Sequence, residues 1–235
     1  MNTSVTLNPG AASISISGST PTVRIRADFA VLHLRAAARA AISAYEVERA
    51  NATEDHGEWV EEMACIVPIS VVMAAAALEA NASEIIQDIL DGSTTLPLTK
   101  GCELLLKEFK EDKSGNALDK YRRIALLFNA VPNTGESPWQ EAQLLTNFRN
   151  YFMHFRPTWD HGDEPKHKLF NGLKAKIPIS RTYRSSSHQF PHGFMTYGCA
   201  KWSVFSVLAF SRSFTALLGV NDTFADPLFD FSLPG

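Results

Sequence analysis

The residues with the clearest potential for chemistry lie in segment 148–157, FRNYFMHFRP. This segment places an Arg, an adjacent Asn and a His close together near the end of an expected helix. An Arg guanidinium can hold a phosphate group, and a His side chain can move a proton near neutral pH. The combination favours phosphate chemistry of the kind found in ribonucleases, in which Arg149 would hold the phosphate and His154 would transfer a proton.

The spacing alone identifies no site, because Arg followed by His after four to six residues is a short pattern. It occurs at Arg26/His33, Arg49/His56, Arg149/His154, Arg156/His161 and Arg181/His188. Among these pairs, only Arg149 and His154 lie in a strongly periodic helical segment. The context of the helix therefore selects this pair.

Helical geometry separates this segment into two faces, at roughly 100° per residue. An aromatic face contains Leu144, Phe148, Tyr151, Phe152 and Phe155, while the opposite side carries Arg149, Asn150, Met153 and His154. Asn150 and His154 are four residues apart and are therefore neighbours on the helix surface. The polar face is then left for solvent, a cleft or another subunit. A surface Arg and His that merely cap or solvate the helix is the alternative.

Arg149, Asn150 and His154 resemble the signature of the HEPN superfamily, a group of small helical proteins that includes many RNases, toxins and antiphage effectors. Upstream, residues 73–81, MAAAALEAN, resemble the small-residue helix with Leu-Glu and a nearby Asn that recurs early in that fold. The resemblance extends over about residues 27–219 and is sharp only in these two stretches. It implies an all-α, antiparallel helical bundle.

The resemblance also implies a homodimer in which two motif helices meet across a two-fold axis. The expected activity is metal-independent RNA cleavage, without a cofactor, by attack of the ribose 2′-hydroxyl to leave a 2′,3′-cyclic phosphate. His154 would act as general base or acid, Arg149 would hold the phosphate, and Asn150 would orient the His or the phosphate. The alternative is a non-catalytic helical module of the same shape that binds RNA, nucleotide or a protein partner.

One departure concerns Arg156, which stands where many HEPN toxins carry a Tyr that a partner nucleotidyltransferase modifies. That partner and that modification are therefore not expected. An inhibitory partner protein remains open, and the sequence does not identify it. Two roles are open for Arg156 itself, contact with phosphate or hydrogen bonding to the last helix carbonyls.

Composition limits the classes of function. The chain has 235 residues, 45% hydrophobic residues and a net charge of −3, which excludes a protein that coats nucleic acid through overall charge. Its three cysteines show no metal-ligand spacing, and we find no signal peptide. The most apolar window, 64–78, is expected to be too short to span a membrane. These features predict a cytoplasmic protein.

RNA binding by a chain of this charge requires a local basic patch. One candidate follows the motif helix and is free of acidic residues, with Lys166, Lys168, Lys174, Lys176, Arg181 and Arg184 as the cations proposed to contact substrate. A solvated loop is the alternative. A zinc site from Asp160, His161, Asp163 and His167 is conceivable, but its spacing fits no familiar motif, and we predict no metal site.

The chain divides into an appendage at 1–26, a helical domain at 27–219 and a tail at 220–235. The appendage is either a β-hairpin formed by 13–17 and 22–26 or a disordered leader. Within the domain, residues 157–194 read as a long irregular loop before the last helix. The expected helices are 28–50 with Asp28 as N-cap, 58–90 interrupted or kinked at Pro68, 99–110, 117–128, a motif helix from 138, and 196–218. Pro157 disfavours helix at Arg156, so the motif helix is expected to end near His154.

Two polar residues of the apolar helix complete the candidates. Glu79 is expected to be the most buried acidic residue, and a buried Glu needs a partner. It either pairs with Arg149 and orients it or lies at the polar edge of its helix. Asn81 either forms a buried hydrogen bond between helices or lies at the same edge.

Overall fold

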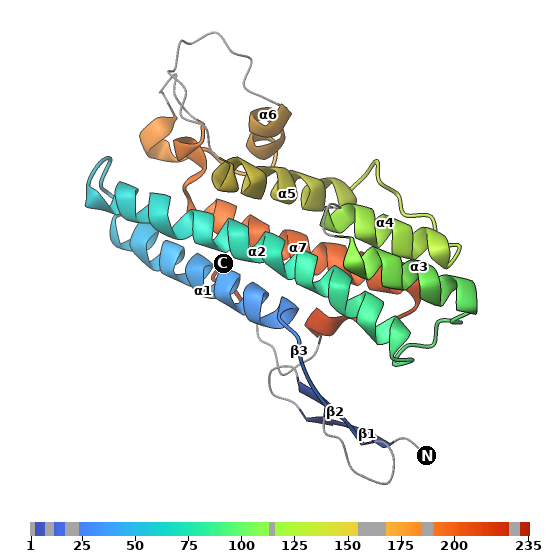
Figure 1. Ribbon diagram of the computed structural model, residues 1–235. Coiled ribbons are helices and arrows are strands. Elements are labelled where there is room, and N and C mark those ends of the chain that lie inside the picture. The colour runs from blue at the N-terminus through green and yellow to red at the C-terminus, as the bar shows by residue number, and fades with distance from the viewer. Residues whose placement is uncertain are drawn as a thin grey trace.

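The computed structural model describes residues 3–7, 12–16, 24–112, 116–154, 168–184, 190–225 and 231–235. In this part of the chain the fold is mostly helical, as expected, with seven α-helices and a small antiparallel sheet (Figure 1). The helices are α1 (Ala30–Ala50), α2 (Glu58–Leu90), α3 (Lys100–Glu111), α4 (Ala117–Leu127), α5 (Trp139–Met153), α6 (Lys168–Lys174) and α7 (Tyr197–Leu218).

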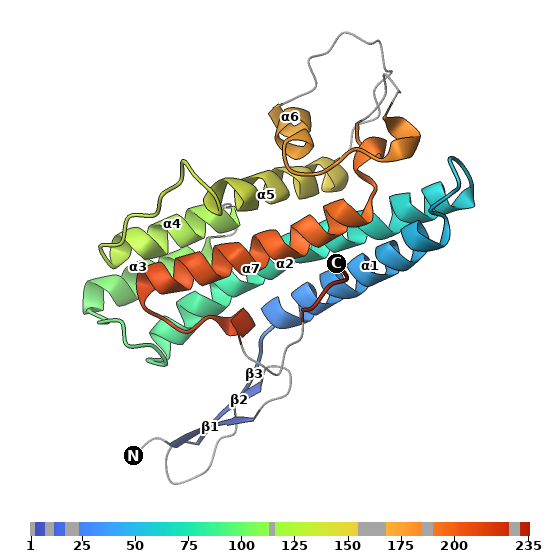
Figure 2. The ribbon, with the colours of Figure 1, turned by 180° about the vertical axis from the view of Figure 1, so that it is seen from behind.

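Helix α2 is the centre of the bundle. It lies between α1 and α5, α7 packs behind it, and α3 and α4 cover its C-terminal half (Figures 1 and 2). By length and composition alone α2 could cross a membrane, so the expectation that its apolar stretch is too short is wrong. In the bundle, however, Ala74, Ala77 and Leu78 are fully buried. The core helix of a soluble protein has these properties.

The N-terminal strands β1 (Thr3–Leu7), β2 (Ala12–Ile16) and β3 (Arg24–Ala27) form an antiparallel sheet in that order. Ile14 pairs with Ile25 across β2 and β3, and with Val5 across β1 and β2. The expected hairpin is therefore present, and β1 extends it by one strand. The sheet lies beside the N-terminal end of α1, into which β3 leads directly (Figure 1).

The start of α1 differs from the prediction, because Asp28 does not cap it. The helix begins at Ala30, and the Glu84 carboxylate of α2 accepts hydrogen bonds from the backbone N–H groups of Phe29 (2.7 Å) and Ala30 (2.9 Å). A carboxylate from another helix thus satisfies the unpaired N–H groups at this terminus. Asp28 instead pairs with Arg26.

The other helix boundaries follow the sequence closely. Thr99 and Thr196 cap α3 and α7 by accepting backbone hydrogen bonds, and Gly219 ends α7 with a left-handed φ of 70°. Pro68 neither ends nor restarts α2, which is continuous across it. Two residues later, the buried Ser70 hydroxyl bonds to the carbonyl of Ala37 at 3.0 Å and so links α2 to α1.

Segment 157–194 is less irregular than expected. Its described part contains α6 and the 3-10 turns Arg181–Tyr183 and His192–Phe194. A side chain at Gly172 would meet Leu144 Cδ1 at 2.8 Å, so glycine permits α6 to pack closely on α5. In the C-terminal tail, buried Phe224 and Phe231 contact each other, and the Pro234 carbonyl accepts a hydrogen bond from Lys201 of α7. The tail thus packs back on the body.

Candidate functional site

A groove of about 730 Å³ crosses the middle of α2 between α1, α4 and α5. Its floor consists of small side chains on one side of α2, namely Ala76, Ala80 and Ser83. Its walls carry polar and charged groups from the three neighbouring helices. The residues that line it are His33, Ala76, Glu79, Ala80, Ser83, Asn116, Ala117, Lys120, Thr146, Arg149, Asn150 and His154.

The two faces of α5 are arranged as the helical periodicity predicts. Leu145 and Phe148 are fully buried, and the Phe148 ring packs against those of Phe152 and Phe194 at centroid distances of 4.6 and 6.5 Å. This anchoring turns Arg149 and Asn150 toward the groove. The aromatic face therefore fixes the rotation of the helix that carries the candidate catalytic residues.

His154 lies at the end of α5 rather than inside it. The helix ends at Met153 and His154 is its C-cap, in agreement with the expectation that His154 is near a helix C-terminus. The backbone N–H of His154 donates to the Asn150 carbonyl at 2.9 Å, and the imidazole is exposed at the mouth of the groove. A substrate can reach this side chain without any rearrangement of the bundle.

Arg149 is held by two neighbours. Its guanidinium forms an ion pair with Glu79 of α2 and donates a hydrogen bond to Asn150 Oδ1 at 2.8 Å. Glu79 is exposed, with 45% of its side chain accessible, so it is not a buried carboxylate. It lies at the polar edge of α2, which was the alternative, and it still pairs with Arg149. The pair adds little stability at such exposure, on the order of 0–1 kcal/mol. Its main effect is to orient the guanidinium.

Asn81 lies two residues after Glu79 but faces the opposite way. It is fully buried, and its Oδ1 accepts a hydrogen bond from the Tyr121 hydroxyl of α4 at 2.7 Å. The same hydroxyl contacts the Leu78 carbonyl at 3.0 Å. The buried hydrogen bond between helices is thus present, and it locks α4 to α2 beneath the groove.

Among the polar residues of the groove, those that sequence reasoning missed include His33 on α1, Asn116 at the start of α4 and Lys120 on α4. They are far from the motif in sequence, so no local spacing connects them with it. Asn116 Oδ1 accepts from the Asp119 backbone N–H at 3.1 Å and caps the start of α4. The small residues of α2 at positions 76, 80 and 83 were the available signal, because a helix with such a stripe leaves a hollow beside bulkier neighbours.

The basic segment after α5 does not contribute its described side chains to this groove. Lys176 forms an ion pair with Glu141 at 2.8 Å, and Lys174 lies over the Phe170 ring. Although burial raises the pKa of Glu141, its hydrogen bonds with Lys176 and Ser137 outweigh that effect and lower it. These contacts place both lysines on the side of α5 occupied by α6.

Arg181 has a structural role instead. Its guanidinium donates to the backbone carbonyls of Asn51, Ala52 and Glu54, which closes the loop between α1 and α2. Arg181 and Arg184 line a separate cavity of about 330 Å³. Arg156, Lys166 and the side chain of Lys168, together with Asp160, His161, Asp163 and His167 of the conceivable zinc site, lie outside the described residues.

No family model, curated protein or solved structure matches this chain.

The arrangement of charge gives the groove a chemical preference. Arg149 and Lys120 bring two permanent cations to its lining and Glu79 a single carboxylate, with His33 and His154 beside them. Among the described residues, no group of three or more His, Cys, Asp or Glu side chains is arranged to hold a metal ion. Cationic and proton-transferring side chains around a hollow are suited to an anionic substrate such as a phosphodiester.

Proposed function

We propose that the protein is a HEPN-like endoribonuclease that cleaves RNA without a metal ion, and that the groove over α2 is its active site. The observation that carries the proposal is the convergence of Arg149, Asn150 and His154 with Lys120 on one groove. Such an enzyme would act in the cytoplasm, where RNA is available, as a toxin or antiphage effector. The helical fold is compatible with this class.

In the proposed reaction the RNA phosphate lies between Arg149 and Lys120, which bind its nonbridging oxygens. The ribose 2′-hydroxyl attacks the adjacent phosphorus, the bond to the 5′ oxygen breaks, and the product is a 2′,3′-cyclic phosphate. Arg149 stabilises the charge that develops on the phosphorus oxygens. His154 moves a proton, and Asn150 keeps the guanidinium in position through its 2.8 Å hydrogen bond.

The groove also offers a reason for the pairing of Arg149 with Glu79. Without RNA, the carboxylate keeps the guanidinium extended across α2 and compensates its charge. Because the pair is partly exposed, a phosphate can compete for the guanidinium at low cost. Glu79 would therefore act as a positioning residue for Arg149 rather than as a catalytic group.

The homodimer remains part of the proposal. The last turn of α5 carries exposed Met153, with 58% of its surface accessible, followed by exposed His154. This end of the motif helix is open for a second copy to approach. Light scattering of the purified chain at several concentrations tests the dimer: a mass of one chain throughout would contradict it.

The test is cleavage of a mixed tRNA and mRNA pool in EDTA by wild type, His154→Ala and the control His56→Ala. His56 is exposed in the loop between α1 and α2, outside the groove. We expect cyclic-phosphate ends with wild type and the control, and a loss of about 10²–10⁴-fold with His154→Ala.

Three results would overturn the assignment. Equal cleavage by wild type and His154→Ala would remove His154 from the chemistry. RNA binding without cleavage by the wild type would favour the alternative, a non-catalytic helical module. Loss of wild-type cleavage in EDTA, with recovery on adding a divalent metal, would instead indicate a metal-dependent reaction.

A further inference from the structure

We infer that His33 is the second proton-transferring residue of this site, so that a single chain carries a complete acid–base pair: His33 accepts the 2′-hydroxyl proton and His154 donates to the leaving 5′ oxygen. The inference rests on the proposed ribonuclease function and extends it to a residue of α1. It differs from a site in which each chain supplies one His and the pair forms only across a dimer.

The position of His33 follows from contacts that fix α1 against α2. Ala30 bonds to Glu84, and the Ala37 carbonyl bonds to Ser70. His33 lies between these two contacts on α1, just as Ala76 and Ala80 lie between them on α2. Its side chain is half-buried and lines the groove at this level.

The same level of α2 receives α5 from the other side. The ion pair between Arg149 and Glu79 ties the two helices together in the stretch that contains Ala76 and Ala80. His33 and His154 therefore flank α2 from opposite sides, with alanine side chains between them. Because those side chains are small, the space over α2 remains open for a phosphodiester and its two bridging oxygens.

The His33 ring is held in place by a neighbour. It packs against the Phe29 ring with a centroid distance of 5.7 Å and an interplanar angle of 31°. Phe29 is in turn fixed by the hydrogen bond from its backbone N–H to Glu84 at 2.7 Å. The imidazole is thus positioned by the structure that starts α1, which an unrelated surface His would not require.

The two His residues reach the groove from separate helices. His33 is in the first turn of α1, and His154 follows the last turn of α5. A phosphodiester in the groove therefore has one imidazole on each side, one for the 2′ oxygen and one for the 5′ oxygen.

The proton and bond changes then balance within the groove. The His33 imidazole takes the proton of the 2′-hydroxyl as its oxygen bonds to phosphorus. The bond from phosphorus to the 5′ oxygen breaks, and this oxygen receives the proton of the His154 imidazolium. The products are a 2′,3′-cyclic phosphate and a 5′-hydroxyl, with the two His side chains in exchanged protonation states that solvent resets.

The first test compares His33→Ala and His33→Gln with wild type and the His56→Ala control, in EDTA. Gln keeps a polar side chain of similar size, so it separates loss of proton transfer from loss of packing. We expect both His33 variants to lose about 10²–10⁴-fold in cleavage and to melt within a few degrees of wild type. Wild-type cleavage by a folded His33 variant would overturn the inference while leaving the ribonuclease function intact. An inactive wild type would overturn both.

The second test separates acid from base. In a dinucleotide substrate with sulfur in place of the bridging 5′ oxygen, the leaving thiolate needs no proton. The defect of His154→Ala should then shrink to less than about tenfold, while the defect of the His33 variants should remain large. The opposite pattern, or equal rescue of both, would overturn the assigned roles.

The third test asks whether the pair belongs to one chain. His33→Ala and His154→Ala chains are co-expressed with different tags, and complexes that carry both tags are isolated. If both His residues act in the groove of one chain, each mixed complex lacks an intact site and stays inactive. Recovered cleavage would overturn the single-chain pair.

Discussion

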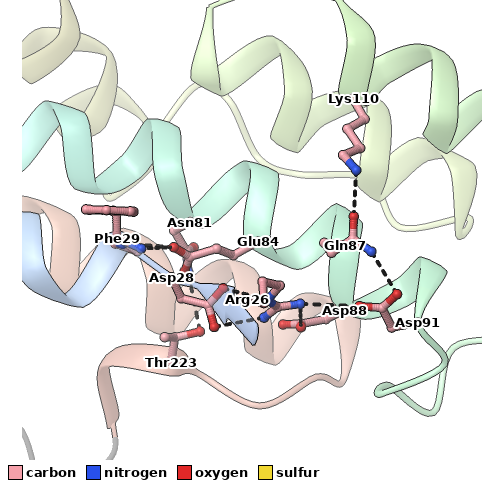
Figure 3. A network of polar contacts seen from close by, with 11 residues as sticks. Arg26, Asp28, Phe29, Asn81, Glu84, Gln87, Asp88, Asp91, Lys110 and Thr223 are labelled. Carbon is pink, nitrogen blue, oxygen red and sulfur yellow. Dashed lines mark hydrogen bonds and ion pairs between the residues drawn. The ribbon is translucent and has the colours of Figure 1, made fainter. Parts of the chain in front are cut away.

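Helix α2 presents carboxylates to an arginine at two places, and the two arginines are used differently. Near its C-terminal end, Asp88 and Asp91 meet Arg26 of β3, the strand that leads into α1 (Figure 3). Near its middle, Glu79 meets Arg149 of α5. Each arginine joins α2 to another segment, and Arg149 in addition lines the groove of about 730 Å³.

Arg26 is saturated by its partners. It bonds to Asp28 at 2.6 and 3.0 Å and contacts Asp88 at 2.8 Å and Asp91 at 3.5 Å. Burial alone would lower the pKa of Arg26, but the hydrogen bonds with Asp28 and Asp88 outweigh it and raise the pKa. Glu84 lies alongside and holds the start of α1 (Figure 3). With carboxylates in excess, this cluster has no capacity for an anion and serves as a structural joint.

Arg149 has the opposite balance. A single exposed carboxylate compensates it, Lys120 and two His residues share its groove, and the floor beneath is alanine. The comparison teaches that a dense polar network is not itself a sign of a functional site. Excess cation beside an unfilled hollow is more informative than the number of hydrogen bonds.

The largest expected effect comes from exchanging each arginine for lysine, which keeps the charge but removes paired hydrogen bonding. Arg149→Lys should lower RNA cleavage by about 10²–10³-fold, because phosphate stabilisation is lost in the transition state. Arg26→Lys should leave cleavage unchanged and lower the free energy of unfolding by about 1–2 kcal/mol, since bonds to charged groups are lost. Initial rates and urea titrations measure the two effects.

Two outcomes for these lysine variants would contradict the prediction. If Arg26→Lys reduced cleavage as strongly as Arg149→Lys while the protein stayed folded, the N-terminal cluster would belong to the functional site. If Arg149→Lys lost stability but no activity, Arg149 would be a second structural joint.

The second largest expected effect is a loss of stability at Tyr121, which lies between the Arg26 cluster and the groove. Tyr121 is fully buried, and its hydroxyl donates a hydrogen bond to Asn81 Oδ1 beneath the groove. Burial raises the pKa of this phenol well above its usual value. Tyr121→Phe strands the Asn81 carbonyl and should cost about 1–3 kcal/mol in the free energy of unfolding. Cleavage per folded molecule should be unchanged. If Tyr121→Phe lowered the free energy of unfolding by no more than a substitution of an exposed residue does, the hydroxyl would not be needed to join α4 to α2.

Much of the fold could be predicted from local sequence. Helical periodicity, the Thr99 cap of α3 and the glycine that ends α7 at 219 placed those elements to within a few residues, because each signal acts over one or two turns. The predicted cap of α1 was wrong for the same reason. Its N–H groups are satisfied by Glu84, a residue 54 positions from Ala30, and no local pattern encodes that contact.

The residues of the candidate site also fall into two groups, those that local sequence predicts and those that only the packing of the helices brings together. Arg149 and Asn150 lie on α5 and His154 is its C-cap, so helical spacing predicted that they lie on one side. His33 and Lys120 reach the groove only through the packing of α1 and α4 on α2, which the sequence does not specify locally. Arg181 shows the converse: its place in a basic stretch indicated RNA contact, whereas in the structure it binds the carbonyls of a loop.

A smaller effect should follow from filling the floor of the groove. Ala80 is half-buried on α2, and leucine is also a good helix former, so Ala80→Leu should fold normally. The larger side chain would occupy the space between His33 and His154 and reduce kcat/KM for RNA by on the order of tenfold through misplacement of the phosphate. Ala36→Leu, at a half-buried position of α1 outside the groove lining, is the control. Equal activity of the two variants would mean that RNA does not enter this hollow.

The smallest expected effect is a pH dependence of stability at the structural joint. Burial raises the pKa of the Glu84 and Asp88 carboxyls despite their hydrogen bonds with the backbone and Arg26. A raised pKa in the folded state means that the folded protein binds these protons more tightly than the unfolded chain does. The stabilising contribution is therefore complete below the unfolded value of about 4 and is lost as the pH rises through the folded value.

Glu84→Gln tests this sign, because Gln keeps an acceptor for the Phe29 and Ala30 N–H groups but does not ionise. Relative to wild type, the variant should gain stability between pH 4 and pH 7 in urea titrations at a fixed temperature. Glu103→Gln is the opposite control, since the hydrogen bond from Lys107 lowers the pKa of Glu103 and its contribution is lost as the pH falls. The same pH trend in both variants would contradict the assignment of burial as the dominant effect at Glu84, and the joint would then depend on its hydrogen bonds alone.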